Sequence, residues 1–398
     1  MSDPLFEPFW SIALLISAVI YVALLEKIRR GLLRLTALDQ QERSSQQPKV
    51  SVIIPCRDEA EHIGNTLDDL TKQDYPQDLL QIIVVNDRST DGTGEIAKKF
   101  CDSFNELIVI DNDQCPENLS PKKYALSLGM QRAHGEILMT TDGDCRYRTG
   151  WVRSLVEGLA DNVGVITGLT IFERGRPEPL WQRLQQMDYL SHSFFAAGAI
   201  GSGMAFNCNG SNLAYRRETF SEIGGYQQIK QVVTGDDTLL LQKIKQIGRW
   251  QIRFTTMPDS LVKSWPEETP RQVFNQRLRW GSGGLSYSPQ ALSFALAVFI
   301  FILLLFLSPF FWLAGSISMF WLLGFALKII QEARVMAAGW RVFRLPTEWM
   351  SFSLLQLIHI PAILTFSIGG HLFGFKWKGQ KFKRTRETAS AQLKTETP

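Results

Sequence analysis

Cysteine and histidine are scarce in this 398-residue chain, and neither is arranged for a disulfide framework or a zinc site. The five cysteines are odd in number, widely scattered and without a C-x-x-C pair, which favours reduced thiols that face a cytosol. His192, His359 and His371 are isolated in the sequence. We therefore expect them to pack or to lie at a membrane interface rather than to bind a metal.

The chain also lacks a large excess of positive or negative charge. The chain carries 42 Lys and Arg against 39 Asp and Glu, a net charge of +3 at pH 7. This balance names no partner by itself, and we expect no nucleic-acid binding. With 45% hydrophobic residues, the chain can bury a large core, and its length favours more than one domain.

Long apolar runs are present at both ends of the chain. Residues 9–25 carry no charge and are about long enough to cross a bilayer as a helix. Acidic residues precede this run and basic residues follow it, the reverse of a cleavable signal peptide; they are Asp3 and Glu7, then Lys27, Arg29, Arg30 and Arg34. By the positive-inside rule, the segment that follows is expected in the cytoplasm.

Residues 291–307 and 310–327 are two further apolar runs, joined by Ser308-Pro309. Together they exceed one membrane span of about 20 residues, so we expect a helical hairpin. Residues 329–344 place apolar side chains on one stripe, as in a helix that lies in the membrane interface.

The last apolar run, residues 351–375, is broken by Pro361 and Gly369-Gly370. A further crossing would place the basic residues from Lys376 onward outside, against the positive-inside rule. We therefore expect this run to enter the membrane and return. Residues 377–398 are expected to form a basic, disordered tail.

The middle of the chain alternates short Val- and Ile-rich runs with helical patterns, which predicts an α/β fold with a doubly wound, mostly parallel sheet. Acidic residues follow several of these runs: Asp58, Glu59, Asp87, Asp142 and Asp144. Ligands bind such sheets outside the carboxyl ends of the strands. We therefore expect these carboxylates to converge on one edge.

The pair Asp142 and Asp144 is separated only by Gly143. Carboxylate oxygens suit hard cations, and magnesium or manganese is commonly held by one or two carboxylates together with substrate phosphates. The pair therefore indicates a divalent metal that accompanies a nucleotide diphosphate. A solvated turn is the alternative interpretation, and the other acidic strand ends argue against it.

A second glycine-rich motif, "GTGEIA" from Gly92, matches a dinucleotide fingerprint with Asp111 about 20 residues further on. The first glycine does not follow its strand directly, because four residues intervene after Asp87. We interpret Gly92 and Gly94 as turn and cap residues rather than as a nicotinamide site.

The motifs "PCRDEAEHI", "NDRSTDGT", "PKKYAL", "TDGDC", "TGDDTLLLQKI" and "QRLRW" occur in this order. Together they resemble the family 2 glycosyltransferases, inverting enzymes with a GT-A fold that are anchored in membranes. Two positions depart from the family pattern: Asp58 stands where Asn is commoner, and Asn86 replaces the first acid of D-D-x-S. The segment "FKWKGQKF" also resembles a W-K-G-R tail of lipid-modifying members, with Gln380 in place of Arg.

The resemblance implies a role for each matching residue. Pro55, Glu59 and Asp87 would line the nucleotide pocket, and Lys123 would approach the phosphates. Asp144 would hold the metal, and Asp142 would bind the donor ribose or sugar. Asp237 would be the catalytic base, with Asp236 beside it. The alternative for Asp237 is a capping carboxylate for the helix that follows.

The segment "TPRQVFNQRLRW" predicts a short amphipathic helix. Thr269 and Gln272 form a capping box, and Pro270 suits the first helical position. The resemblance makes Gln276, Arg279 and Trp280 a platform on this helix, with Arg279 at the diphosphate and Trp280 at the acceptor. The alternative is a basic helix docked on anionic lipid.

We therefore expect a metal-dependent glycosyltransferase that is an integral protein of a bacterial inner membrane. It would move a sugar from a nucleotide donor to a membrane lipid, and by this interpretation the donor is UDP-linked. Expected divisions are an anchor at 1–34, a cytoplasmic GT-A domain at 35–288 with an interfacial helix near 269–285, and a membrane region at 289–376. A polysaccharide synthase acting in an oligomer and a membrane-bound nucleotidyltransferase are alternatives.

Overall fold

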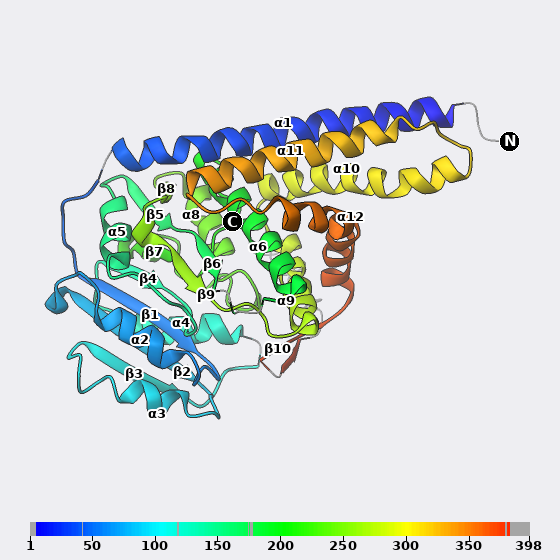
Figure 1. Ribbon diagram of the computed structural model, residues 1–398. Coiled ribbons are helices and arrows are strands. Elements are labelled where there is room, and N and C mark those ends of the chain that lie inside the picture. The colour runs from blue at the N-terminus through cyan, green and yellow to red at the C-terminus, as the bar shows by residue number, and fades with distance from the viewer. Residues whose placement is uncertain are drawn as a thin grey trace, which may run out of the picture.

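The computed structural model describes residues 5–41, 43–117, 119–173, 175, 178–378 and 380–382. A seven-stranded sheet forms the centre of the α/β domain, which the sequence predicts to be the catalytic domain, with strand order β3-β2-β1-β4-β7-β5-β8 (Figure 1). Strand β7 alone runs antiparallel to both of its neighbours. The strands are β1 (Val50–Cys56), β2 (Leu80–Asp87), β3 (Leu107–Asn112), β4 (Ile137–Thr140), β5 (Val163–Thr167), β7 (Leu213–Arg216) and β8 (Gln251–Phe254). The predicted doubly wound, mostly parallel sheet is confirmed.

Helices cover both faces of this sheet. Side chains alternate between the two faces along a strand; Val52 and Ile54 of β1 therefore join one hydrophobic cluster while Ile53 joins the other. The first cluster is covered by α2 (Ile63–Thr71), α3 (Thr93–Lys98) and α5 (Trp151–Gly158). The second is covered by α4 (Pro121–Arg132), α6 (Leu180–Gly201) and α8 (Thr238–Ile247).

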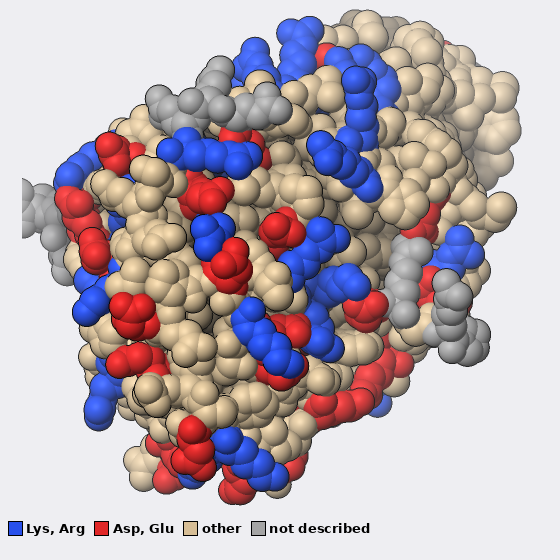
Figure 2. All heavy atoms as spheres, turned by 60° about the vertical axis from the view of Figure 1, so that its left-hand side comes forward, with Lys and Arg blue, Asp and Glu red and all other residues tan. Residues whose placement is uncertain are grey.

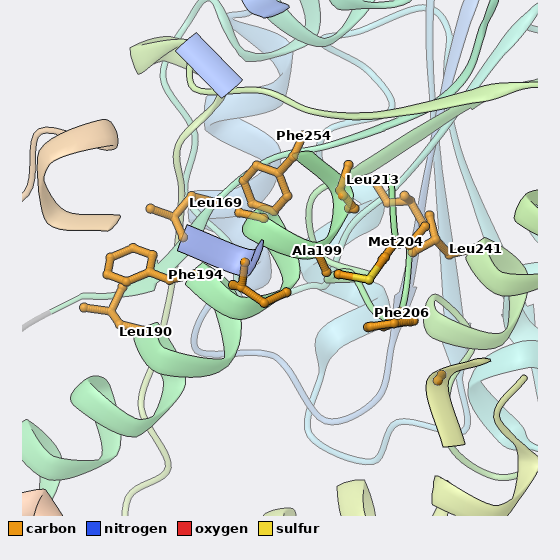
Figure 3. Packing of buried hydrophobic residues seen from close by; sticks show 14 of the residues in the cluster. Leu169, Leu190, Phe194, Ala199, Met204, Phe206, Leu213, Leu241 and Phe254 are labelled. Atoms are coloured by element: carbon orange, nitrogen blue, oxygen red, sulfur yellow. The ribbon is translucent and has the colours of Figure 1, made fainter. Parts of the chain in front are cut away.

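The second cluster continues from the sheet into the membrane helices. Figure 3 shows its centre, where side chains of α6 meet those of the strands and of α8. The labelled residues are Leu169, Leu190, Phe194, Ala199, Met204, Phe206, Leu213, Leu241 and Phe254. Phe194 is fully buried and stacks on Phe343 with 5.7 Å between ring centroids. This shared core fixes the catalytic domain against the membrane helices.

Shorter elements complete the domain. A small two-stranded sheet pairs β6 (Thr170–Phe172) with β9 (Val262–Ser264) in parallel. Helix α7 (Arg217–Glu222) and the 3₁₀ turns η1 (Gln77–Leu79) and η2 (Pro258–Ser260) lie between strands, whereas helix α9 (Pro270–Ser282) and the 3₁₀ turn η3 (Gly284–Ser286) lead from β9 to the long helices that follow. Thr269 caps α9, and its Oγ1 accepts from the Gln272 backbone N at 3.3 Å. The predicted helix start is confirmed.

Four long helices carry the apolar runs: α1 (Phe6–Gln41), α10 (Pro289–Leu313), α11 (Trp321–Val342) and α12 (Trp349–Leu372). Helices α1, α10 and α11 lie side by side along one side of the catalytic domain (Figure 1). Helices α1, α10 and α12 are long and apolar enough to cross a membrane. Figure 2 shows acidic and basic side chains mixed over the catalytic domain, whereas the surface toward the upper right carries almost none.

The predicted hairpin exists, but its turn was placed wrongly. Ser308 and Pro309 lie inside α10, and the chain reverses between Ala314 and Phe320. Ser308 sits at the contact with α1, where its Oγ accepts from Trp10 Nε1 at 3.0 Å. The predicted interfacial helix at 329–344 is the second half of α11, which packs along α1.

The predicted break in residues 351–375 is absent, because α12 continues through Pro361 and Gly369. Both ends of α12 contact the catalytic domain. At its start Arg183 of α6 donates to Ser351 Oγ at 3.2 Å. At its end, a Cβ added to Gly370 would lie 2.7 Å from the Gly281 carbonyl carbon of α9.

The chain therefore leaves α12 on the side of the catalytic domain. There β10 (Phe375–Trp377) pairs with β11 (Gln380–Phe382) in an antiparallel hairpin. Part of the expected disordered tail is thus an ordered hairpin, and residues 383–398 lie outside the described residues. Residues 6–34 of the expected anchor form the larger part of α1, which continues to Gln41, and residues 1–4 lie outside the described residues.

Candidate active site

One cavity of about 1360 Å³ brings the predicted site residues together. It is lined by Pro55, Glu59, Asp87, Asp142, Asp144, Asp236, Asp237, Gln276, Arg279 and Trp280. These residues come from the carboxyl ends of β1 and β2, from the loop after β4, from the start of α8 and from α9. Of the predicted site residues, Lys123 alone does not line the cavity.

Asp87 lies at one end of the cavity, at the last residue of β2. The guanidinium of Arg88 donates to both of its carboxylate oxygens, at 2.9 and 2.8 Å, and Asn112 Nδ2 donates to Oδ1 at 2.7 Å. Arg88 has a positive φ of 57°, which folds its side chain back onto its neighbour. These bonds fix the orientation of the Asp87 carboxylate.

The loop after β1 carries Asp58 and Glu59 into the same cavity. Thr93 Oγ1 accepts from the Glu59 backbone N at 2.8 Å, and Asp58 Oδ1 accepts from the Thr90 backbone N at 2.8 Å. Burial raises the pKa of Glu59 to about 7, although the nearby ammonium of Lys378 opposes this shift. Glu59 therefore changes its charge near neutral pH.

Asp142 and Asp144 follow β4 on a turn that packs closely against the loop after β1. A Cβ added to Gly143 would lie 2.6 Å from Cys56 Sγ and 3.3 Å from Glu59 Cγ, so this middle position has room only for glycine. Ser264 Oγ donates to Asp144 Oδ2 at 2.8 Å. Burial and the charge of Asp142 raise the pKa of Asp144.

This carboxylate pair fits a divalent metal bound together with substrate phosphates. Hard cations such as magnesium and manganese take oxygen ligands and are usually completed by waters and phosphates. Within the described ranges there is no group of three or more His, Cys, Asp or Glu side chains that could hold a metal by themselves. The protein would thus supply one or two ligands, and the nucleotide would supply the others.

The lysine that reaches the carboxylates is Lys122, so the prediction for Lys123 was wrong. Lys122 Nζ lies 2.8 Å from Asp142 Oδ1 and 3.3 Å from Asp236 Oδ2. Lys123 is fully buried beneath the loop before Asp236 and donates to the carbonyls of Val232 and Thr234 at 2.5 and 2.7 Å. Burial lowers the pKa of Lys123 to about 8.

Asp237 is both a helix cap and a cavity residue. Its carboxylate accepts from the Thr238 backbone N at the start of α8 and from the Gly210 backbone N at 2.8 Å. The alternative interpretation, that Asp237 caps the helix that follows, is thus correct, but Asp237 also lines the cavity. Burial and the charge of Asp236 raise the pKa of Asp237, whereas Lys122 and Lys123 lower the pKa of Asp236 against the effect of burial. Asp237 is the carboxylate of this pair that takes up a proton more readily.

Helix α9 places aromatic and cationic groups over the cavity. Arg277 is nearly buried, pairs with Asp188 Oδ2 at 2.5 Å, and lies over the ring of Trp280 at 4.1 Å. Arg279 lies 5.3 Å from the Trp377 ring, and its Nε has no hydrogen-bond partner among the described residues. A buried donor without a partner is costly, so Arg279 is suited to an anionic ligand.

The cavity continues from Asp237 between α10 and α12, where its walls become apolar. The apolar residues include Leu292, Ala295, Leu296, Phe299, Leu355, Ala362, Ile363 and Phe366. At the boundary with α11 the cavity also reaches Glu332 and His359. Glu332 is bound by the buried Lys328 at 2.9 Å. The site thus joins a charged end to an apolar end.

Sequence analysis gave no role to several residues that line the cavity: Lys122, Asp188, Arg277, Trp377 and Lys378. Trp377 and Lys378 lie in the segment "FKWKGQKF", whose resemblance to a W-K-G-R tail carried no residue role. The signal for Lys122 was its place beside Lys123 in "PKKYAL". Asp188 lies in the long helix α6, whose sequence carries no motif, so its pairing with Arg277 depends on tertiary structure alone.

Comparison with known proteins gives three findings. The family model described as "Glycosyl transferase family 2" matches residues 51–224. The chain is 28% identical over 246 residues to the probable glycosyltransferase YdaM of Bacillus subtilis, covering 61% of this chain and 56% of that protein. It is 22% identical over 349 residues to beta-monoglucosyldiacylglycerol synthase of Synechocystis, covering 83% of this chain and 70% of that protein.

Among solved structures, the chain is similar to the mannosyltransferase PcManGT of Pyrobaculum calidifontis in complex with GDP-Man and Mn²⁺. The TM-score is 0.55 at 18% identity, and the match covers 89% of this chain and 99% of that one. This likeness shows a GT-A-like fold. Together with the family model, it supports a family 2 glycosyltransferase.

Proposed function

We propose that this protein is a membrane-bound, inverting glycosyltransferase that moves a sugar from a nucleotide diphosphate donor to a hydroxyl of a membrane lipid. The observation that carries the proposal is the single cavity that joins Asp87, Asp144 and Asp237 to an apolar space between α10 and α12. Its charged end suits a nucleotide diphosphate with a metal, and its apolar end suits a lipid.

The donor would lie with its base at Asp87 and its diphosphate between Asp144 and Arg279. The donor is UDP-linked by the resemblance of the motif around Asp87. A divalent ion bound at Asp144, with Asp142 beside it, would neutralise the charge that develops on the leaving diphosphate. Arg279 would add a fixed positive charge on the other side, because its guanidinium has an Nε without a partner among the described residues.

Asp237 would act as the general base. Its carboxylate takes the proton of the acceptor hydroxyl while the hydroxyl oxygen forms a bond to the anomeric carbon. The bond from that carbon to the diphosphate oxygen breaks, and its electron pair leaves with the nucleoside diphosphate. A single displacement of this kind inverts the anomeric centre. Lys122 bridges Asp142 and Asp236, so it would hold the donor and acceptor halves in register.

A lipid acceptor is favoured over a growing polysaccharide by the apolar walls of the cavity. Leu296 and Phe299 of α10 line the same cavity as Ile363 and Phe366 of α12, and these apolar walls suit an acyl chain better than a sugar chain. A polysaccharide synthase would need a polar path for its product. Beta-monoglucosyldiacylglycerol synthase, one of the relatives, is by its name an enzyme of lipid glycosylation.

The basic residues that flank the long helices indicate how the protein lies in the membrane. We propose that α1 and the α10–α11 pair cross a bacterial inner membrane, that α12 starts and ends at the catalytic side, and that the catalytic domain lies in the cytoplasm. Lys27, Arg29, Arg30 and Arg34 follow the apolar part of α1 on the catalytic side, as the positive-inside rule requires. This arrangement also puts Lys376 and Lys378 inside, without any break in α12.

The test uses membranes that contain the full-length protein, radiolabelled UDP-sugars and manganese. We expect label in the lipid extract with wild type, and none above background with Asp144→Asn, while both proteins remain in the membrane fraction. Label found only in a nucleotide product would favour a nucleotidyltransferase, and label in a polymer would favour a polysaccharide synthase. Near-normal transfer by Asp144→Asn would contradict the role of this carboxylate.

A further inference from the structure

The hairpin after α12 reaches across the donor end of the cavity. Lys378 Nζ lies 2.7 Å from Glu59 Oε1 and 3.3 Å from the Asp58 carbonyl oxygen. Trp377 lies under the guanidinium of Arg279 at 5.3 Å. The Lys376 backbone N donates to Asn275 Oδ1 of α9 at 3.1 Å. The hairpin is therefore held on α9 while its lysine extends to the end of β1.

Lys378 is the first of the two residues that connect β10 to β11, since Trp377 pairs with Gln380. Its φ is +45°, as a two-residue hairpin turn with a positive φ at its first position requires. Among the described residues, four that are not glycine have a positive φ: Asp58, Arg88, Arg344 and Lys378. Three of the four border the donor end, since Asp58 and Lys378 line the cavity and Arg88 holds Asp87. The turn thus places the side chain of Lys378 at the cavity.

The charges around Lys378 indicate what it would bind. Glu59 packs beside Gly143, so the ammonium lies next to the turn that carries Asp142 and Asp144. Two other cations near the cavity contact two carboxylate oxygens each: Lys122 bridges Asp142 and Asp236, and Arg88 donates to both oxygens of Asp87. Lys378 contacts one carboxylate oxygen, of Glu59, together with the Asp58 carbonyl oxygen, and its side chain is 31% exposed. It can therefore exchange Glu59 for an arriving anion.

We propose that Lys378 is a donor-binding residue that the C-terminal hairpin places against the phosphates of the nucleotide. This inference rests on the proposed function and adds a residue to it. Lysine binds phosphate as a compact point charge, and its charge would compensate the negative charge that the leaving diphosphate gains when the sugar bond breaks. Glu59 would hold the ammonium in place until the nucleotide arrives.

The test measures binding of nucleotides to the purified full-length protein in detergent with manganese. The affinity for UDP is compared with the affinity for uridine, which lacks the diphosphate. GDP is compared with guanosine in the same way, in case the protein binds a guanine nucleotide. We expect Lys378→Gln to weaken binding of the diphosphate at least 10-fold and to leave binding of the nucleoside unchanged. Lys378→Arg, which keeps the charge, should recover part of the loss. Lys376→Gln, two residues away and exposed, is the matched control and should bind as wild type.

Two results would overturn the inference. Unchanged diphosphate binding by Lys378→Gln would show that the ammonium does not contact phosphate. Equal weakening of the nucleoside and the diphosphate would show that the hairpin only braces the pocket. Failure of the proposed function looks different, because wild-type protein would then bind neither UDP nor GDP.

Discussion

The two roles of Asp237 can be separated by one substitution. Asp237→Asn keeps the size of the side chain and one acceptor oxygen for the helix start, because Asn caps helices about as well as Asp. It removes the ability to take a proton at the pH of the reaction. We expect turnover to fall about 10²–10⁴-fold, the usual contribution of a general base.

The structure also limits how far Asp237→Asn lowers the free energy of unfolding. The carboxylate accepts from two backbone N–H groups, those of Thr238 and Gly210, through different oxygens. The amide group of Asn can serve only one of them, so one N–H loses its acceptor at a cost of about 1–3 kcal/mol. The loss in turnover corresponds to about 3–5 kcal/mol of activation free energy. The catalytic effect therefore exceeds the structural one.

The assay measures transfer rate against pH together with the melting temperature in detergent. Wild-type turnover should rise with pH through the pKa of Asp237, which burial and Asp236 raise above its ordinary value, and this rise should be absent in Asp237→Asn. Ser288→Ala removes a different cap, the one that accepts from the Ala291 backbone N in α10, and should keep its turnover. The base assignment is refuted if Asp237→Asn keeps more than about a tenth of wild-type turnover.

Two further predictions concern stability. Lys123 has a pKa of about 8 in the folded protein, whereas its ordinary value is 10.5. Between pH 8 and pH 10.5 the unfolded chain therefore binds more protons than the folded protein. The free energy of unfolding should rise with pH across this range, by about 3 kcal/mol at most. Lys123→Met should lack this rise in a comparison of melting temperatures at pH 7.5 and 10, and an identical rise in both proteins would contradict the assignment. Gly281→Ala would put a Cβ 2.2 Å from the Phe366 carbonyl oxygen and should destabilise the α9–α12 contact by about 1–3 kcal/mol, with loss of turnover. Gly64→Ala, whose Cβ would meet Ile96 at an ordinary 3.6 Å, is its control and should not lower the melting temperature.

The convergence of the carboxylates was predictable because it follows from topology. Parallel strands end at one edge of a sheet, so acids that directly follow β1, β2 and β4 meet without any knowledge of side-chain packing. The start of α9 was predictable for a similar reason, since Thr269 and Gln272 interact locally. Local or topological rules thus reached most of the site.

The errors arose where tertiary packing decides between equivalent choices. Lys122 and Lys123 are neighbours on α4, and about 100° of helix rotation separates them; only the packing of α4 determines which one faces the cavity. The apolar stripe over residues 329–344 suggested a helix at the membrane surface, but this segment belongs to α11, whose charged residues include Lys328 and Glu332. Lys328 and Glu332 instead pair with each other and with Gln356 of α12, so they are satisfied inside the bundle.

The turn between α10 and α11 was misplaced because Pro309 was taken as the end of the helix. Proline removes one backbone donor, but a membrane helix tolerates this when neighbouring groups satisfy the freed carbonyl. The real turn lies at Gly315, which has a φ of +68° and is followed by Ser316 and Ser318. Small polar residues after an apolar run were therefore the better signal.

The contact between Glu59 and Lys378 joins residues 319 positions apart. During translation the end of β1 leaves the ribosome long before the hairpin does, and in the proposed arrangement α10 and α11 cross the bilayer and α12 packs against α9 in between. A nascent chain can form its sheet early, yet its donor end stays incomplete until the last of these helices is seated. Under the proposed function, sugar transfer would therefore begin only after α12 has packed against α9.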